Sequence, residues 1–253
     1  MIRQNFNADW TVEKGDGNSR MNSFLGNTQT KTVHLPYDAM IHEARTPDTK
    51  NGAQTGFYPG GEYIFQKHFT APQAWQGKPV SLVFEGVYQT ALVYLNGWLL
   101  TRNVNGYAEF TVEAGPYLKY GADNLLKVIA DNSLEPNSRW YTGSGIYRPV
   151  RLLVGNKVYL PQDTVRITTR EADEGFALLD VTAQVQSAST VTERVTLQQT
   201  ICREGTAVLT DRQNLLLQPG ESRTVSFRYC VDSPALWSLS LIHISEPTRH
   251  AQI

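Results

Sequence analysis

The segment 137–152 carries the residues of this chain that are best suited to bind a ligand. It places three aromatics, three arginines and two glycines between two strand-like runs. Aromatic rings offer broad apolar faces with polar tips, and arginine donates several hydrogen bonds in a fixed geometry. Because long ordered loops in compact domains are usually functional, we expect Arg139, Trp140 and Tyr141 to contribute to a binding site.

A second group of candidates is Asp38, His42 and Glu43, which follow one another closely. These side chains could act as an acid and a base, but their spacing matches no metal signature, and the sequence contains no His-Glu-x-x-His. An N-cap role for Asp38 over a short turn explains its position better. Phosphate-binding, dinucleotide-binding and Gly-x-Ser-x-Gly patterns are also absent from the sequence. We therefore expect no catalytic residue, no metal and no cofactor in this chain.

Composition restricts the class of protein further. The chain has 253 residues, of which 41% are hydrophobic and 19% charged, as in an ordinary globular protein. Its net charge of −1 gives no electrostatic reason to expect binding to nucleic acid or to an anionic membrane. Its apolar runs are too short to span a bilayer, and no apolar signal-peptide core follows Met1. The compartment stays open between periplasm and cytoplasm. Cys202 and Cys230 are expected to be half-buried thiols on strands.

The elements that must position these candidates are predicted to be strands. Short runs rich in Val, Leu, Tyr, Phe and Thr alternate with Gly, Pro, Asn and Asp clusters, so we expect an all-β protein. Asn96-Gly97 predicts a hairpin with a type I′ turn and positive φ at both positions. Many strands at even spacing favour a two-sheet jelly roll over residues 1–156. Its strands are predicted at 62–69, 80–85, 90–95, 98–100, 108–112, 124–130 and 150–154.

A second strand pattern follows a linker predicted at 157–163. We expect an incomplete immunoglobulin-like sandwich over 164–238, in which about five of the usual seven strands can be recognised. Pro219-Gly220 marks one of its turns. The predicted strands are 165–168, 177–185, 193–201 and 223–229.

Several motifs occur together in a specific order and spacing. They are Asn5-Phe6-Asn7 with Trp10, residues 33–38, the glycine-rich loop 56–61 before Tyr63, Val87-Tyr88, residues 93–97, Asp131-Asn132, and Trp140 with residues 145–148. This set resembles the sugar-binding domain of glycoside hydrolase family 2, which includes β-galactosidases, β-glucuronidases and β-mannosidases. The resemblance covers most of residues 4–238 and implies a galactose-binding-like jelly roll followed by an immunoglobulin-like domain. Tyr37 departs from it, since histidine is usual there.

The resemblance also implies roles for the candidate residues. Some family members carry an aspartate that reaches the sugar pocket at the position of Arg139, and a cation cannot accept hydroxyl hydrogen bonds as a carboxylate does. Arg139 therefore either recognises the sugar differently or pairs with another domain. Trp140 and Tyr141 are expected to contact substrate, since aromatic faces stack on sugar C–H surfaces. Phe57 and Tyr58 either line the pocket rim or pin their own loop.

Residues 145–148 have two interpretations. The architectural one places Ile146 in the core and lets the neighbouring glycines take a tight backbone conformation. The alternative is that this loop approaches the active site of a further domain. Asn96-Gly97, in contrast, is expected only to fold the domain.

The catalytic part implied by the resemblance is not found in this sequence. Retaining glycosidases use two carboxyl groups, which in this family are glutamates of a TIM barrel of about 250 residues. No such barrel pattern follows Ser238, and no Asn-Glu dipeptide occurs. We expect an N-terminal, non-catalytic portion, inactive alone, of a hydrolase that cleaves terminal non-reducing β-D-galactose from β-galactosides. Its partners would be carbohydrate, the missing barrel and, in a homo-oligomer, further copies. The alternatives are a stand-alone carbohydrate-binding module and a structural all-β protein.

Residues 239–249 fit neither domain. They read Leu-Ser-Leu-Ile-His-Ile-Ser-Glu-Pro-Thr-Arg, which is the translation of an adapter used in transposase-based sequencing libraries. The alternative is a genuine short strand with a polar end. We expect residues 239–253 to be an artefact and exclude them from functional reasoning.

Overall fold

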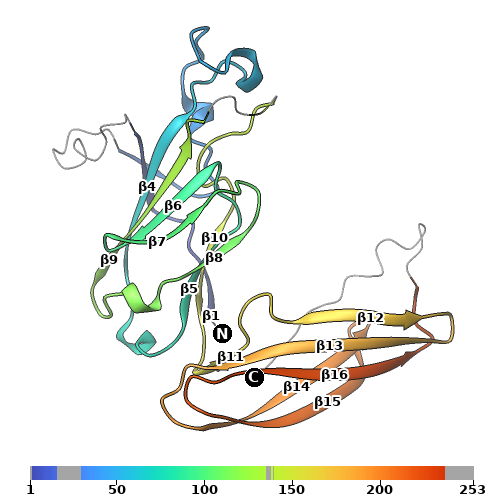
Figure 1. The fold of residues 1–253 in the computed structure, drawn as a ribbon. Helices are drawn as coiled ribbons and strands as arrows, with labels where there is room; N and C mark the ends of the chain where they lie inside the picture. The colour runs from blue at the N-terminus through green and yellow to red at the C-terminus, as the bar shows by residue number, and fades with distance from the viewer. Residues whose placement is uncertain (1, 16–29, 135–137, 139, 237–253) are drawn as a thin grey trace. The chain divides into compact units, whose positions relative to one another are not determined.

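Strands dominate the computed structural model, which describes residues 2–15, 30–134, 138 and 140–236 (Figure 1). The prediction of an all-β protein is therefore confirmed. The helical segments of these residues are short 3-10 turns: η1 (Met40–His42), η2 (Gly52–Thr55), η3 (Gln73–Trp75) and η4 (Gly115–Tyr117). None of the helices in this described part is long and apolar enough to cross a membrane. Two compact units divide between Val154 and Gly155.

The first unit is a sandwich of two antiparallel sheets. One sheet has the strand order β1 (Ile2–Asn5), β10 (Val150–Val154), β5 (Val80–Phe84) and β8 (Phe110–Glu113). The other has the order β3 (Lys31–Val33), β2 (Trp10–Lys14), β4 (Gly61–Thr70), β9 (Asp123–Asn132), β6 (Thr90–Leu95) and β7 (Trp98–Asn103).

The core of the first unit lies between these sheets, because alternate residues of each strand face inward. Trp10, Phe65 and Phe84 are completely buried, and burial of such side chains stabilises the fold by about 1.5–3 kcal/mol each. Ile146 is also fully buried in this core, which confirms its predicted place.

The predicted hairpin turn at Asn96-Gly97 is confirmed. Leu95 pairs with Trp98, so the connection has two residues, and φ is +52° at Asn96 and +89° at Gly97. These positive values are those that a type I′ turn requires and that Asn-Gly tolerates at low cost.

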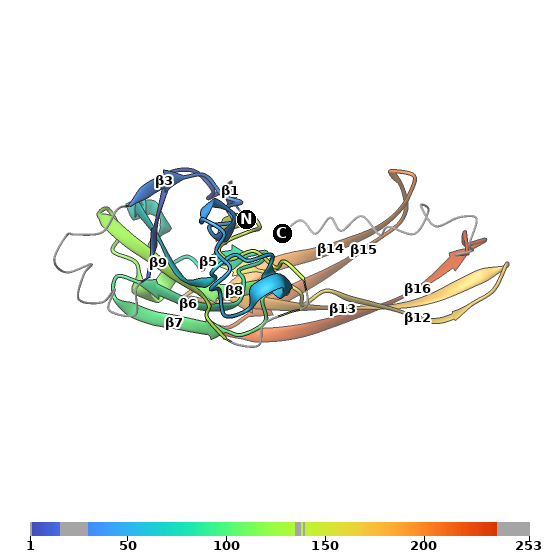
Figure 2. The same cartoon turned by 90° about the horizontal axis from the view of Figure 1, so that it is seen from above.

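The second unit has its own core and its own pair of sheets (Figures 1 and 2). In one sheet, β13 (Phe176–Ser187) is central and pairs with β16 (Ser222–Asp232), β12 (Arg166–Ala172) and β11 (Val158–Tyr159). The other sheet is the pair β14 (Glu193–Arg203) and β15 (Thr206–Leu217). Val158 and Tyr159 fall in the segment predicted as a linker, but they form strand β11, and Val158 packs in this core.

The two cysteines lie on strands, as predicted, but the prediction of half-burial is wrong. Both thiols are free and exposed, Cys202 on β14 and Cys230 on β16. On β16, Phe227 and Tyr229 face the core, so the alternation of the strand turns Cys230 outward.

Candidate functional site

The loop that follows β9 is held against residues 37–39 by backbone hydrogen bonds. The Tyr37 N–H donates to the Ile146 carbonyl at 2.8 Å, and the Ala39 N–H donates to the Ser144 carbonyl at 2.8 Å. Gly145 exchanges two further hydrogen bonds of 3.0 Å with the backbone of Tyr88. The loop that carries Trp140 and Tyr141 is therefore anchored at its C-terminal end to two other segments of the sandwich.

Asp38 is the centre of this contact. Its Oδ1 accepts the N–H of Ser144 at 2.9 Å and that of Met40 at 3.1 Å. Its Oδ2 accepts the phenolic O–H of Tyr141 at 2.5 Å. A carboxylate that accepts three hydrogen bonds is well satisfied, so Asp38 fixes the loop and does not serve as a free acid or base.

The contacts of Asp38, His42 and Glu43 give no support to an acid/base role, the less favoured interpretation of the sequence, although the carboxylates of Asp38 and Glu43 both lie near Tyr63. The side chains of His42 and Glu43 turn to other partners: the His42 ring stacks on Tyr37 with centroids 5.0 Å apart, and Glu43 pairs with Lys14 at 2.8 Å. The predicted N-cap of η1 is also wrong by one residue, because the N-cap position is Ala39. Asp38 lies just before it and receives the N–H of Met40 through its side chain.

An aromatic cluster forms beside this carboxylate. The rings of Tyr58 and Tyr141 meet edge to face with centroids 5.3 Å apart, and the Arg45 guanidinium lies 5.1 Å from the Tyr58 ring centre. Trp140 and Phe57 stand at 63% and 42% exposure. The structure thus brings Tyr58 and Tyr141 together, and it leaves the side chains of Trp140 and Phe57 exposed. Arg139 lies outside the described residues.

The glycine-rich loop is pinned mainly by its own hydrogen bonds. The buried Thr55 hydroxyl donates to the Tyr58 carbonyl at 3.2 Å, and the Phe57 N–H donates to the Gly52 carbonyl at 2.9 Å. Thr46 donates its N–H to the Phe57 carbonyl at 3.0 Å. These bonds hold Phe57 at a positive φ of 65° with its ring exposed.

Two tyrosines of the site are held strongly in the neutral form. Burial raises the pKa of Tyr141 well above its ordinary value, and the hydrogen bond to Asp38 and the negative charge of Asp38 raise it further. Burial likewise raises the pKa of Tyr63, and the nearby carboxylates of Glu43 and Asp38 add to the effect. Both phenols therefore act as hydrogen-bond donors and not as bases.

Asn132 is a supporting residue that the sequence did not single out for this role. Its buried amide donates to the Gly143 carbonyl at 3.1 Å and to the Ser144 hydroxyl at 2.6 Å. It ends β9, directly before the segment that leads to Trp140, and its position in the Asp131-Asn132 motif was the available signal. Among the described residues, no three His, Cys, Asp or Glu side chains are placed to hold a metal ion.

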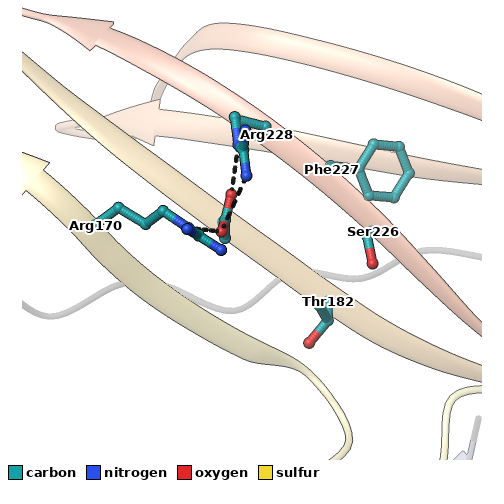
Figure 3. Close-up of a pocket in the computed structure, with 6 residues that line it drawn as sticks. Arg170, Thr182, Ser226, Phe227 and Arg228 are labelled. Atoms are coloured by element: carbon teal, nitrogen blue, oxygen red, sulfur yellow. Dashed lines mark hydrogen bonds and ion pairs between the residues drawn. The ribbon is translucent and has the colours of Figure 1, made fainter.

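The second unit has a hollow of about 400 Å³ on the sheet formed by β12, β13 and β16 (Figure 3). Asp180 lies between two arginines there, accepting a hydrogen bond of 2.8 Å from Arg228 and a second one from Arg170. The hydrogen bonds from Arg228 and Arg170 lower the pKa of Asp180 below its ordinary value. Two cations on one carboxylate leave the hollow net positive. It is lined by Arg170, Asp180, Thr182, Ser226, Phe227 and Arg228.

The depressed pKa of Asp180 predicts how the stability of this unit depends on pH. The ionised Asp180 stabilises the folded state fully at pH values above its unfolded-state pKa of about 4. This stabilisation is lost as the pH falls through the lower pKa that Asp180 has in the folded state. Urea unfolding at several pH values between about 5 and 2.5 should therefore show that the free energy of unfolding falls as the pH falls. The Asp180→Asn variant should show a smaller fall over the same range. An unchanged pH profile in that variant would show that other carboxyl groups carry the effect.

Comparison with known proteins identifies the first unit. The model of the glycosyl hydrolase 2 galactose-binding domain-like family matches residues 10–177. The chain belongs to this family. The match runs from β2 through the first unit into the start of β13. It is the galactose-binding-like, N-terminal type of domain in glycoside hydrolase family 2.

Relatives of this family include enzymes named for different activities. A beta-galactosidase of Bacteroides ovatus is 32% identical over 238 residues, covering 94% of this chain and 28% of that protein. A beta-glucuronidase of Formosa agariphila is 26% identical over 260 residues, covering 92% of this chain and 26% of that protein.

Solved structures of the family share the fold. A glycosyl hydrolase family 2 member from Bacteroides cellulosilyticus superposes with a TM-score of 0.82 at 29% identity, over 95% of this chain and 32% of that one. A putative beta-galactosidase from Bacteroides fragilis gives 0.80 at 29% identity, over 94% and 37%. The chain thus spans between 26% and 37% of the length of these four relatives.

Proposed function

We propose that this chain is the carbohydrate-facing, non-catalytic N-terminal portion of a family 2 glycosidase. The observation that carries the proposal is the contact between Tyr58 and Tyr141, with Tyr141 bonded to the Asp38 carboxylate. Phe57 and Trp140, which are exposed and next to these tyrosines in the chain, complete the aromatic cluster. Two exposed rings beside two fixed rings provide apolar faces for the C–H surface of a sugar, while the phenols and Arg45 can hydrogen-bond to hydroxyls. Arg139, next to Trp140 in the chain, would add a cation to this rim.

The substrate of the whole protein is proposed to be a terminal, non-reducing β-D-galactose residue, cleaved with retention of configuration. Support comes from the B. ovatus relative, which is named a beta-galactosidase and aligns with 94% of the chain. The two carboxyl groups that such a reaction needs would lie on a TIM barrel, as in other retaining enzymes of this family. In this proposal the first unit shapes the rim of the pocket, and the second, immunoglobulin-like unit is a spacer. The chain alone would be inactive.

Calorimetric titration of the chain tests the binding part of the proposal. We expect lactose to bind with a Kd between about 10 μM and 10 mM, and more tightly than phenyl β-D-glucuronide or mannobiose. Trp140→Ala should weaken lactose binding about tenfold, because an exposed aromatic face is lost. Val191→Ala, which shortens an exposed apolar side chain of the second unit, is the control. If the Trp140→Ala variant bound lactose as tightly as the native chain, the exposed aromatic rings would not be part of the sugar-binding site.

Resequencing the source DNA through codon 238, without transposase adapters, distinguishes the proposal from its alternative. We propose that residues 239–253, which lie outside the described residues, are adapter-derived. A reading frame that continues into a barrel with an Asn-Glu pair supports the glycosidase. The return of the same eleven residues followed by a stop would favour a stand-alone carbohydrate-binding module.

A further inference from the structure

A second pair of aromatic rings is exposed on the first unit, outside the cluster described above. Trp98, the first residue of β7, is 65% exposed, and Tyr117, the last residue of η4, is 39% exposed. Their ring centroids lie 6.4 Å apart and their planes meet at 46°. Single exposed apolar side chains are common on protein surfaces, but these two rings lie side by side and form a paired aromatic patch, which is the more informative observation.

These rings lie far from the aromatic cluster around Asp38. In the six-stranded sheet, Gly61 pairs with Asn132 at the end that carries the glycine-rich loop, and Leu95 pairs with Leu126 just before the hairpin of Trp98. The two β9 residues of these pairs, Leu126 and Asn132, are six positions apart, which corresponds to about 20 Å along the strand. One monosaccharide cannot contact both places, so Trp98 and Tyr117 constitute a separate site.

The backbone beneath the two rings is fixed by a buried amide network. Asn96 donates from its side-chain amide to the Tyr117 carbonyl at 2.8 Å and to Asn124 Oδ1 at 2.9 Å, and its own Oδ1 accepts the Leu125 N–H at 3.1 Å. Asn124 is completely buried and also accepts the N–H of Lys119 at 2.8 Å. The hairpin that carries Trp98 and the turn that carries Tyr117 are thereby tied together. A ligand would not have to order them, which favours binding.

Two rings alone offer only a small apolar surface. Leu99 is 51% exposed, but successive residues of a strand point to opposite faces, so it does not extend the surface around Trp98. Protein interfaces require a much wider contiguous area, about 800 Å² on each partner. Two fixed, inclined rings instead fit the C–H face of one or two pyranose units, with the sugar hydroxyls remaining in water.

We propose that Trp98 and Tyr117 form a second carbohydrate-binding surface, which engages a polysaccharide chain away from the aromatic cluster of the pocket rim. This surface goes beyond the proposed function, because it holds a polymer and does not depend on which terminal sugar is cleaved. Its two rings and the Asn96–Asn124 support belong to the first unit alone.

Native affinity electrophoresis of the chain tests this proposal. The gels contain soluble β-1,4-galactan, galactomannan or xyloglucan. We expect at least one polysaccharide to retard the chain, and Trp98→Ala to weaken that binding about tenfold. Tyr117→Ala should have a smaller effect in the same direction, and Trp98→Phe should retain part of the binding. Leu99→Ala, which shortens an exposed neighbour on the opposite face, is the matched control, and urea unfolding verifies that each variant is folded.

Two results would overturn the second surface. One is the absence of retardation by all three polysaccharides, or retardation that Trp98→Ala leaves unchanged. The other is a concentration-dependent dimer, seen by light scattering, that Trp98→Ala abolishes, which would make this surface a contact between copies. The Trp140→Ala variant separates the two sites, since it should weaken lactose binding and keep polysaccharide retardation.

Discussion

Replacing Gly145 with alanine is expected to destabilise the first unit by about 2–5 kcal/mol. The residue has a φ of +129°, a conformation that L side chains rarely adopt. A Cβ at this position would lie 2.8 Å from Phe65 Cζ and 2.8 Å from the Tyr37 carbonyl oxygen. Phe65 is fully buried, so it cannot move aside without disturbing the core. Urea unfolding followed by hydrogen exchange in β4 and β9 measures the effect.

The backbone around Gly145 cannot relax to relieve this clash at low cost. Its N–H and carbonyl are both bonded to Tyr88, and the residues on either side accept hydrogen bonds from Ala39 and Tyr37. Moving the chain would break several of these bonds, each contributing about 0.5–1.5 kcal/mol. We therefore expect Gly145→Ala to disturb the loop of Trp140 as well, with a loss of lactose binding.

Gly77→Ala is the matched control for this prediction. Gly77 also has a positive φ, +76°, but nothing lies within 4 Å of the position a Cβ would take. Because the added methyl group meets no neighbouring atom, only the unfavourable backbone conformation destabilises the variant. We expect its free energy of unfolding to fall by about 1 kcal/mol. If the two variants were equally stable, steric contact with Phe65 would not be what requires glycine at position 145.

The parts of the fold that could be predicted are those with local signals. Strand β4 places Tyr63, Phe65 and Phe69 toward the core at alternate positions, and Asn96-Gly97 indicates a two-residue turn. Strand β15 could not be found in this way. Only Leu215 and Leu217 of its residues are buried, and the middle of the strand, residues 210–214, is polar, so no apolar alternation runs along its length. Its strand conformation is stabilised by pairing with β14 over the full hairpin.

The candidate site could be predicted only in part, for a related reason. Trp140, Tyr141, Phe57 and Tyr58 stand out by residue type, since aromatics in loops between strands are uncommon without a role. That Tyr58 packs on Tyr141 could not be derived, because 83 residues separate them. The role of Asp38 was mistaken for the same reason: its local pattern indicates a helix cap, while two of its three hydrogen-bond donors lie more than 100 residues away.

Replacing Asp38 with alanine is expected to destabilise the first unit by about 2–4 kcal/mol and to release the loop of Trp140. The change leaves the N–H groups of Ser144 and Met40 and the hydroxyl of Tyr141 without their acceptor. Urea unfolding measures the change in stability. Lactose titration detects release of the Trp140 loop as a loss of lactose affinity. Asp48→Ala is the control, since Asp48 lies in the exposed loop before η2.

The variants Asp38→Asn and Tyr141→Phe separate the charge of Asp38 from its hydrogen bonds. An asparagine keeps an acceptor for the N–H of Ser144 but removes the negative charge, so the pKa of Tyr141 should fall while burial still holds it above its ordinary value. Phenol absorbance during an alkaline titration, compared with Tyr141→Phe, follows this group. A double-mutant cycle should give a coupling of about 1–2 kcal/mol between the two residues. A coupling near zero would mean that Tyr141 is held by Tyr58 and burial alone, and that Asp38 acts only on the backbone of the loop.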